Sequence, residues 1–223
     1  MENTICTSNI EILFEDNDIL VINKPVGVLS EDSPKGEKGI LTHLQKENIH
    51  LLHRLDREVG GVMVFAKNKK SASALSTDIA NGRFYKSYLA VTDGIPENDE
   101  GVYKDLLFKD SKKNRSFVVN RMRKGVREAS LEYVVLKKSE KNALVKVLLH
   151  TGRTHQIRVQ FSSRKTPLTG DGRYGSKVRD CNIALHSHKI RFTHPTTKKE
   201  VEFISEPDFN AYPWNLSEEC ENA

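Results

Sequence analysis

The chain has 223 residues, of which 37% are hydrophobic and 29% charged, and its formal net charge is +5. This composition is typical of a globular protein with one large domain or two small ones, and it does not indicate a disordered chain or a disulfide-rich scaffold. No apolar run approaches the roughly 20 residues that a membrane-spanning helix needs, and the amino terminus has neither a basic leader nor an apolar signal core. The three cysteines are far apart, which fits a reducing compartment. The sequence therefore predicts a soluble, cytoplasmic protein that does not associate with a membrane.

Secondary structure is predicted from apolar and β-branched runs between turn residues. Strands are expected over residues 10–14, 19–23, 62–66, 85–91, 116–120, 130–136, 144–149, 184–192 and 200–204. A helix over 69–81 has Ala72, Leu75 and Ile79 at helical spacing, and a second over 154–163 places two polar side chains on one face. Many strands with few helices predict an α+β fold with a mixed, largely antiparallel sheet. We expect an extension over 1–9, one catalytic domain over 10–207 and an acidic tail over 208–223.

The stretch HRLDREVGG, residues 53–61, combines charged side chains with the start of an apolar strand. Ionised groups near a core cost free energy unless they are paired. Asp56 is the best candidate for chemistry here, because a carboxylate that a cation orients can act as a nucleophile or a base. The structural alternative is an Asp that caps the turn into the strand, or an ion pair at its edge.

A second polar group opens the helix predicted over 154–163, in the stretch LLHTGRTHQIRVQ. The arginine fork matches carboxylates and phosphates, and the N–H groups at a helix start also favour anions. A solvated polar face explains one such residue but not four recognition-type side chains within six positions. The four residues are Arg153, His155, Gln156 and Arg158.

Tyr85 and Tyr88 fall on opposite faces of one predicted strand, so one is expected in the core, and an exposed one offers a face on which a nucleobase can stack. Histidines occur in near pairs, but no cysteine or acidic residue repeats beside them at ligand spacing, so no metal site is predicted. Glycine-rich phosphate loops and a serine-hydrolase elbow are absent.

Cations cluster in two segments. Residues 111–127 contain seven Lys or Arg and no acid, and residues 153–179 contain seven more with only Asp171 opposing them. Such clusters suit a polyanion such as RNA, which they bind through phosphates, although solvated hairpin loops explain them as well. We expect Arg121, Arg123 and Lys124 to belong to an RNA footprint.

Six motifs together resemble the RluA-type pseudouridine synthases over roughly residues 10–207. In chain order they are VINKPVGVLS, HRLDREVGG, FYKSYLAVTDG, LLHTGRTHQIRVQ, LTGDGRYG and IALHSHKIRFTHP. The resemblance implies that a uridine already in rRNA or tRNA is flipped out of its stack, cut at its N1–C1′ bond, and rejoined through C5. No metal or cofactor is implied, and the family leans toward monomers.

The resemblance also implies roles for individual residues. Asp56 would be the nucleophile, Tyr88 would stack on the target uracil, and Arg158 would pair with Asp56. Arg54 would lie near the space that the flipped nucleotide leaves, and Leu185 would pack against the base. Arg153, His155 and Gln156 are expected to bind substrate.

Two departures from the family pattern matter. Val59 and Gly60 stand where Thr-Ser is commoner, which puts loop geometry and substrate preference in doubt. Only about nine residues precede the first predicted strand, so the chain resembles the short members that lack an S4 RNA-binding domain. A non-catalytic RNA-binding protein with the same fold is the main alternative. An Asp-dependent glycoside hydrolase would need a second catalytic carboxylate.

Overall fold

The computed structural model describes residues 10–46 and 48–216, so the predicted extension over 1–9 lies outside the described residues. The chain divides into two compact units. The first unit comprises Met1–Lys86 and Ser187–Glu206, and the second comprises Ser87–His186 and Pro207–Ala223. The chain passes between them within β5 (Tyr85–Asp93) and β10 (Leu185–Thr193). No helix in the described part of the chain is both long and apolar enough to cross a membrane.

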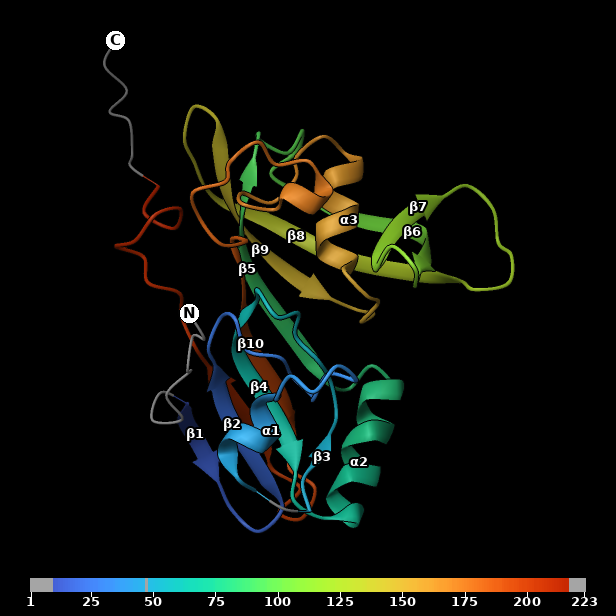
Figure 1. The fold of residues 1–223 in the computed structure, drawn as a ribbon, viewed down its shortest axis with the longest axis vertical. Coiled ribbons are helices and arrows are strands. Elements are labelled where there is room, and N and C mark those ends of the chain that lie inside the picture. Colours follow the sequence, from blue (N-terminus) through green and yellow to red (C-terminus); the bar gives the residue numbers. More distant parts are fainter. Residues whose placement is uncertain (1–9, 47, 217–223) are drawn as a thin grey trace. The chain divides into compact units, whose positions relative to one another are not determined.

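The sheet of the first unit has β2 and β4 at its centre. Strands follow the order β1-β2-β4-β10, with β3 beside β4 and β11 beside β10 (Figure 1). The strands new here are β1 (Glu11–Glu15), β2 (Ile19–Lys24), β3 (His50–Leu51), β4 (Gly60–Ala66) and β11 (Glu200–Ile204). The pairs β1–β2, β2–β4, β3–β4 and β10–β11 are all antiparallel. Every residue of β4 is buried, which explains its unbroken apolar run.

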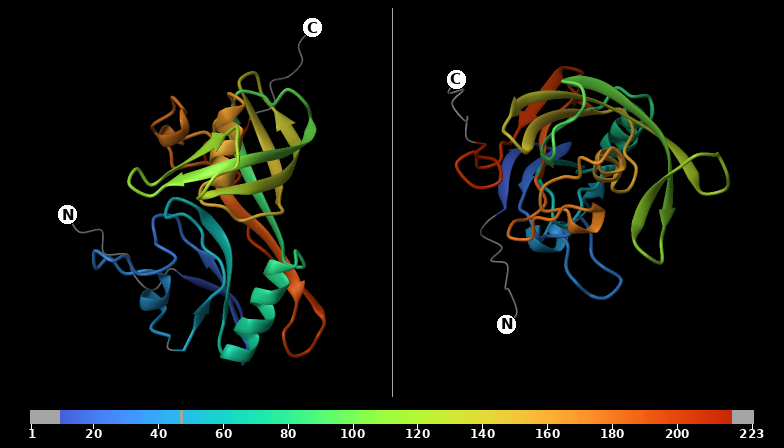
Figure 2. Two further views of the ribbon diagram at one scale, coloured as in Figure 1. Left: turned by 90° about the vertical axis from the view of Figure 1, so that its right-hand side faces the viewer. Right: turned by 90° about the horizontal axis from the view of Figure 1, so that it is seen from above.

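Two helices accompany this sheet, α1 (Ile40–Leu44) and α2 (Lys69–Ala80). The side chain of Asn68 caps α2 by accepting the N–H of Ser71 at 2.8 Å. Leu75 of α2 packs with β2, β4 and β10 in a core that includes Val21, Val64 and Ile190, and Figure 2 shows the helix beside these strands. The period-3.6 pattern of the sequence thus gave the buried face of α2 correctly.

The second unit is built on long antiparallel strands in the order β5-β9-β8-β6-β7. They are β6 (Glu100–Asp110), β7 (Arg115–Val119), β8 (Val126–Lys138) and β9 (Asn142–Leu149). Helix α3 (Gln156–Ser163) lies on one face of this sheet, and its Val159 packs with Leu107 and Ala129 (Figure 1). A short 3₁₀ turn, η2 (Gly172–Tyr174), packs beside α3.

The structure confirms the predicted α+β class with a largely antiparallel sheet. The sequence did not predict β6, because its apolar residues occur in short blocks of two and three between charged residues on a half-exposed surface. Its hydrogen bonds to β7 on one side and β8 on the other specify it as a strand. Three shorter elements, α1, β3 and η2, were also missed, and α3 begins two residues later than predicted.

The acidic tail was assigned no structure from the sequence. Its described part returns to the second unit, where Trp214 and Leu216 pack against Val91, Leu144 and Ala184. The ring of His186 lies edge-on to Trp214, with centroids 6.3 Å apart. This part of the tail is therefore packed on the domain.

Candidate active site

Asp56 lies in the loop between β3 and β4, and backbone hydrogen bonds hold this loop. The N–H of Val59 donates to the carbonyl of Asp56 at 3.0 Å, which closes the turn without any side-chain hydroxyl. Leu55 is buried and its backbone is clamped by Ser30, whose Oγ accepts the N–H of Leu55 at 3.0 Å and donates to its carbonyl at 2.7 Å. The substitution of Val59-Gly60 for Thr-Ser thus leaves a closed turn at the predicted nucleophile.

Lys24 supports this loop from the core. Its side chain is 1% exposed, and Nζ donates to the carbonyls of Val28 at 2.7 Å and Pro25 at 2.9 Å and approaches that of Arg57 at 3.4 Å. Burial lowers the pKa of Lys24 to about 7, and the negative charge of Asp56 opposes that shift. Lys24 is therefore electrostatically coupled to Asp56.

The segment VINKPVGVLS was predicted only as a family motif, with no role for Lys24 or Ser30. Available signals were a lysine that ends a buried strand and a serine six residues later in an apolar context. The N–H of Gly27 adds a bond to the carbonyl of Arg57 at 2.8 Å, with Gly27 at a φ of +91°. Residues 24–30 and 55–57 thus form one hydrogen-bonded support, which we call the loop anchor.

The two arginines beside Asp56 lie at the surface. Arg54 forms an ion pair with Glu31, and Arg57 forms one with Glu37. Both guanidinium groups are exposed, and each pairs with a nearby glutamate. The two arginines of the charged stretch therefore place no unpaired charge near the core. The predicted role of Arg54 near a flipped nucleotide stays a prediction.

His53 is the interior member of the same stretch. Its Nε2 accepts the N–H of Val64 at 3.3 Å, and its enclosed Nδ1 has no hydrogen-bond partner. Burial lowers the pKa of His53 to about 3, and the positive charge of Lys86 adds to the effect. His53 is therefore a neutral, structural imidazole.

In the second unit, the predicted site arginine of α3 is held by a buried carboxylate. Arg158 donates through Nε to Asp171 Oδ2 at 2.6 Å and through Nη2 to Oδ1 at 2.9 Å. Both side chains are almost completely buried, and the bidentate geometry fixes the plane of the guanidinium. Asp171 belongs to the LTGDGRYG motif, so this contact gives that motif a physical purpose that the sequence did not reveal. Pairing of Arg158 with Asp56 stays a prediction.

The other polar residues at the start of α3 hold the turn that precedes it. Gln156 is buried, and its Oε1 accepts Thr151 Oγ1 at 2.7 Å and the N–H of Arg153 at 3.0 Å. His155 caps the helix at a φ of +53°, and its Nδ1 lies 3.0 Å from the hydroxyl of Tyr174. Arg153 is exposed and donates through Nε to the carbonyl of Glu128 at 2.9 Å. The structure indicates that the amide of Gln156 is used structurally.

Two predicted base-contacting residues lie on the strands that link the units. Tyr88 of β5 and Leu185 of β10 are each 6% exposed. Tyr85, on the opposite face of β5 from Tyr88, is half-buried and carries the guanidinium of Arg191 at 4.9 Å from its ring centroid. One of these two tyrosines was expected in the core, and the structure shows that it is Tyr88.

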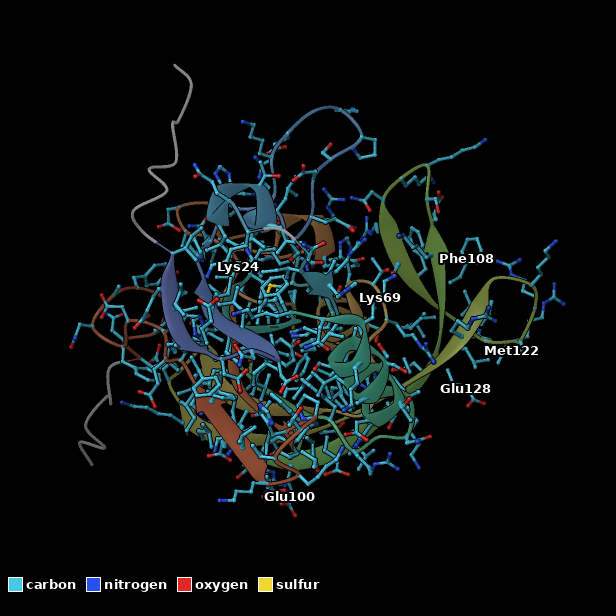
Figure 3. The ribbon with its side chains drawn as sticks, turned by 90° about the horizontal axis from the view of Figure 1, so that it is seen from below. Lys24, Lys69, Glu100, Phe108, Met122 and Glu128 are labelled. Atoms are coloured by element: carbon cyan, nitrogen blue, oxygen red, sulfur yellow. The ribbon has the colours of Figure 1, made fainter. Side chains whose placement is uncertain are left out.

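The predicted RNA footprint lies in the connection between β7 and β8. Arg121, Arg123 and Lys124 are all exposed, and the guanidinium carbon of Arg123 lies 5.1 Å from the ring centroid of Phe108. Figure 3 shows Phe108 and the exposed Met122 on this part of the second unit, with side chains directed outward. The connection thus presents cations next to apolar surface.

One group in the described residues has the spacing of metal ligands, namely Asp16, Asp18 and His194. Asp16 Oδ2 lies 2.9 Å from His194 Nε2, and the backbone N–H groups of Thr196 and Thr197 point at His194 Nδ1. Hydrogen bonds from Ser71, Thr196 and Asn68 lower the pKa of Asp18 to about 2. These groups form hydrogen bonds with one another and with the backbone. The cluster therefore stabilises the fold by linking the end of β10 to the start of β2.

Residues 18–163 match the family described as RNA pseudouridylate synthase. A curated RNA pseudouridine synthase of Aquifex aeolicus is 35% identical, over 92% of this chain and 72% of its own. Ribosomal large subunit pseudouridine synthase C of Buchnera aphidicola (strain Sg) is 32% identical, over 88% of this chain and 67% of its own. The solved structure of human RNA pseudouridylate synthase domain containing 4 has a TM-score of 0.74 and 26% identity, and covers 89% of each chain. The chain therefore belongs to the RluA-type family of RNA pseudouridine synthases.

Proposed function

We propose that this RNA pseudouridine synthase isomerises uridine within RNA by using Asp56 as its nucleophile. The observation that supports the proposal best is the loop anchor, which holds the backbone on both sides of Asp56 by hydrogen bonds and contains a buried lysine that is electrostatically coupled to its carboxylate. Such a support fixes a carboxylate in place, as a nucleophile that attacks one defined atom requires.

The proposed reaction balances without an oxidant, a reductant or a cofactor. The carboxylate of Asp56 attacks either C1′ of the ribose or C6 of the uracil, and the N1–C1′ bond breaks. The uracil then rotates, a C5–C1′ bond forms, the bond to Asp56 breaks and releases its carboxylate, and C5 loses its proton while N1 gains one. An enzyme of this kind flips the nucleotide out of its stack at a cost of a few kcal/mol, which phosphate contacts offset.

The remaining predicted site residues receive their roles from the family resemblance. Tyr88 stacks on the uracil and assists loss of the C5 proton, and Leu185 packs against the base. Arg158 holds Asp56 ionised. Its bidentate bond to Asp171 supports this role, because it fixes the guanidinium in one orientation. Arg54 lies near the space that the nucleotide vacates, whereas Arg153 and His155 contact the RNA backbone at the start of α3.

We propose ribosomal or transfer RNA as the substrate, and a monomer acting in the cytoplasm as the active form. Ribosomal RNA is supported by the relatives named ribosomal large subunit pseudouridine synthase C, which include the Buchnera protein. The exposed cations Arg121, Arg123 and Lys124 support binding through phosphates rather than through a sequence-reading groove.

The experiment that tests the proposal measures tritium release from RNA labelled at uridine C5. Unmodified ribosomal and transfer RNA transcripts are incubated with the wild-type protein, with Asp56→Asn, and with Asp78→Asn, which removes a carboxylate of α2 as a matched control. We expect release by the wild type and the control, and at least a 10³-fold loss for Asp56→Asn with RNA affinity retained. Release by Asp56→Asn at the wild-type rate would exclude Asp56 as the nucleophile. RNA binding without release by any of the three proteins would favour a non-catalytic RNA-binding protein.

A further inference from the structure

Arg115, the first residue of β7, carries a guanidinium that forms no ion pair with the described residues. This guanidinium also forms no hydrogen bond in the described part of the chain, and its Nε is enclosed without an acceptor. The two Nη nitrogens are not enclosed in this way and retain access to solvent. The enclosed Nε without an acceptor costs free energy, whereas the solvent-accessible Nη donors can exchange water for a ligand.

Aromatic rings hold this guanidinium in place. Its central carbon lies 5.1 Å from the ring centroid of Tyr174 and 5.4 Å from that of Phe117. Cation–π contact of this kind orients the planar group and reduces the entropy that it loses when it forms a hydrogen bond. With rings already packed against it, the guanidinium has its N–H donors left to offer, and these match the oxygens of a phosphate.

Two carboxylates near Arg115 in the fold form hydrogen bonds with other residues. Asp110 is opposite Arg115 in the β6–β7 register, but its Oδ1 accepts the backbone N–H groups of Lys112 and Lys113 at 3.0 Å each. Asp171 is held by both arms of Arg158. The guanidinium of Arg115 therefore forms no ion pair with either carboxylate, and it lies in a segment, residues 111–127, that contains no acid.

Tyr174 connects Arg115 to the predicted site arginine. Its ring centroid lies 5.2 Å from the guanidinium carbon of Arg158, and its hydroxyl accepts the N–H of Ser116 at 2.8 Å. The start of β7 and the start of α3 are thus fixed to one buried ring. An acceptor that binds Arg115 would be placed at a defined position relative to Arg158.

We propose that Arg115 is a backbone-phosphate contact for the RNA substrate, held in its binding geometry by Phe117 and Tyr174. This inference rests on the proposed function for the identity of the ligand, and it adds a site at the turn end of the β6–β7 hairpin to the footprint at Arg121, Arg123 and Lys124. Since a phosphate contact positions the substrate without reading its sequence, the effect is expected in affinity and register rather than in base choice.

The test measures equilibrium binding of fluorescein-labelled ribosomal RNA transcripts by anisotropy over a series of salt concentrations. Three variants are compared in an Asp56→Asn background, so that binding is measured without turnover. Arg115→Gln should weaken binding about tenfold and lower the magnitude of the log K against log [salt] slope by about one. Arg115→Lys should retain the slope and lose part of the affinity, because it keeps the charge but not the fork.

The matched control is Arg83→Gln, which removes an arginine of the first unit that already pairs with Asp78. It should leave affinity and slope unchanged. Wild-type slope and affinity in Arg115→Gln, with an unchanged thermal midpoint, would overturn the proposal and leave Arg115 a packing residue. Tritium release by the wild-type protein is measured separately. Its absence, together with a reduced slope in Arg115→Gln, would refute the proposed reaction while supporting the phosphate site.

Discussion

Individual residues in this chain are held by bonds that the sequence motifs do not display. The lysine of NKPVGVLS is buried under the loop that carries Asp56, and the aspartate of LTGDGRYG holds Arg158. Neither motif was assigned a role from the sequence. In this chain, Lys24 supports the loop of the HRLD motif, and Asp171 holds the arginine of the RTHQIR motif. Each of these two motifs therefore supports a residue of another motif.

Lys24 gives the stability of the protein a specific dependence on pH. Its pKa falls from 10.5 to about 7 on folding, so the unfolded chain binds more protons between these values and stability rises with pH through that window. We expect the free energy of unfolding of the wild type, minus that of Lys24→Met, to increase from pH 7 to pH 10 by at most about 1.4 kcal/mol per pH unit. Urea denaturation at pH 6, 8 and 9.5 measures it. A difference that is constant with pH would show that Lys24 stays charged in the folded protein.

The buried ion pair of Arg158 and Asp171 predicts that a small change at Asp171 strongly lowers the free energy of unfolding. Asp171→Asn keeps the shape of the side chain but removes the charge that binds both arms of a buried guanidinium, which should cost about 3–5 kcal/mol of stability. Glu202→Gln, which breaks the partly exposed pair with Lys189, should cost about 1 kcal/mol or less. Chemical denaturation of both variants makes the comparison, and equal costs would contradict the structural role of Asp171.

At the scale of elements, the connection between β7 and β8, which pair with opposite sides of β6, concentrates exposed cations in the second unit. Gly125, at a φ of +84°, allows the chain to turn into β8, and the N–H of Val126 donates to the carbonyl of Arg123. The turn is thus fixed by the backbone, which leaves the side chains of Arg121, Arg123 and Lys124 available to a ligand.

Charge reversal tests this connection as an RNA contact. Replacement of Arg121, Arg123 and Lys124 by Glu should lower RNA affinity by about 10²–10³-fold near physiological salt, because several phosphate contacts are lost and repulsion is added. Lys69→Glu with Lys70→Glu, at the exposed start of α2, is the control and should change affinity little. Filter binding with unmodified ribosomal transcripts measures both. Unchanged binding in the triple variant would remove the connection from the footprint.

On the scale of the whole molecule, the described part of the tail completes the second unit. Trp214 covers Val91, Leu144 and Ala184 and lies against His186, the neighbour of Leu185. Trp214→Ala should therefore cost about 2 kcal/mol, since the indole is half-buried. Phe209→Ala, at an exposed side chain, should cost less than about 1 kcal/mol. Thermal denaturation followed by circular dichroism makes the comparison, and equal costs would show that Trp214 contributes no packing.

The sequence predicted the fold class, the buried strands and α2, because hydrophobic periodicity reports burial directly. It missed β6, where short apolar blocks between charged residues form a strand through pairing on both sides rather than through a pattern of their own. It also missed Lys24 and Asp171 as site residues, because a hydrogen bond between segments far apart in the chain leaves no local signal. The predicted substrate contact at Gln156 stays a prediction, and the structure adds that its amide bonds the preceding turn and the carbonyl of Ser130, contacts that left no local signal in the sequence.

The buried amine of Lys24 has a consequence for chemical reactivity. With a pKa of about 7, a large share of it is an unprotonated nucleophile at neutral pH, whereas exposed lysines are almost all protonated. Its enclosure by the loop anchor shields it from acylating reagents as long as residues 24–30 and 55–57 stay bonded. The rate at which a small anhydride acylates Lys24 therefore reports how often the loop of Asp56 opens. Acylation of Lys24 thus measures the opening rate of the proposed catalytic loop.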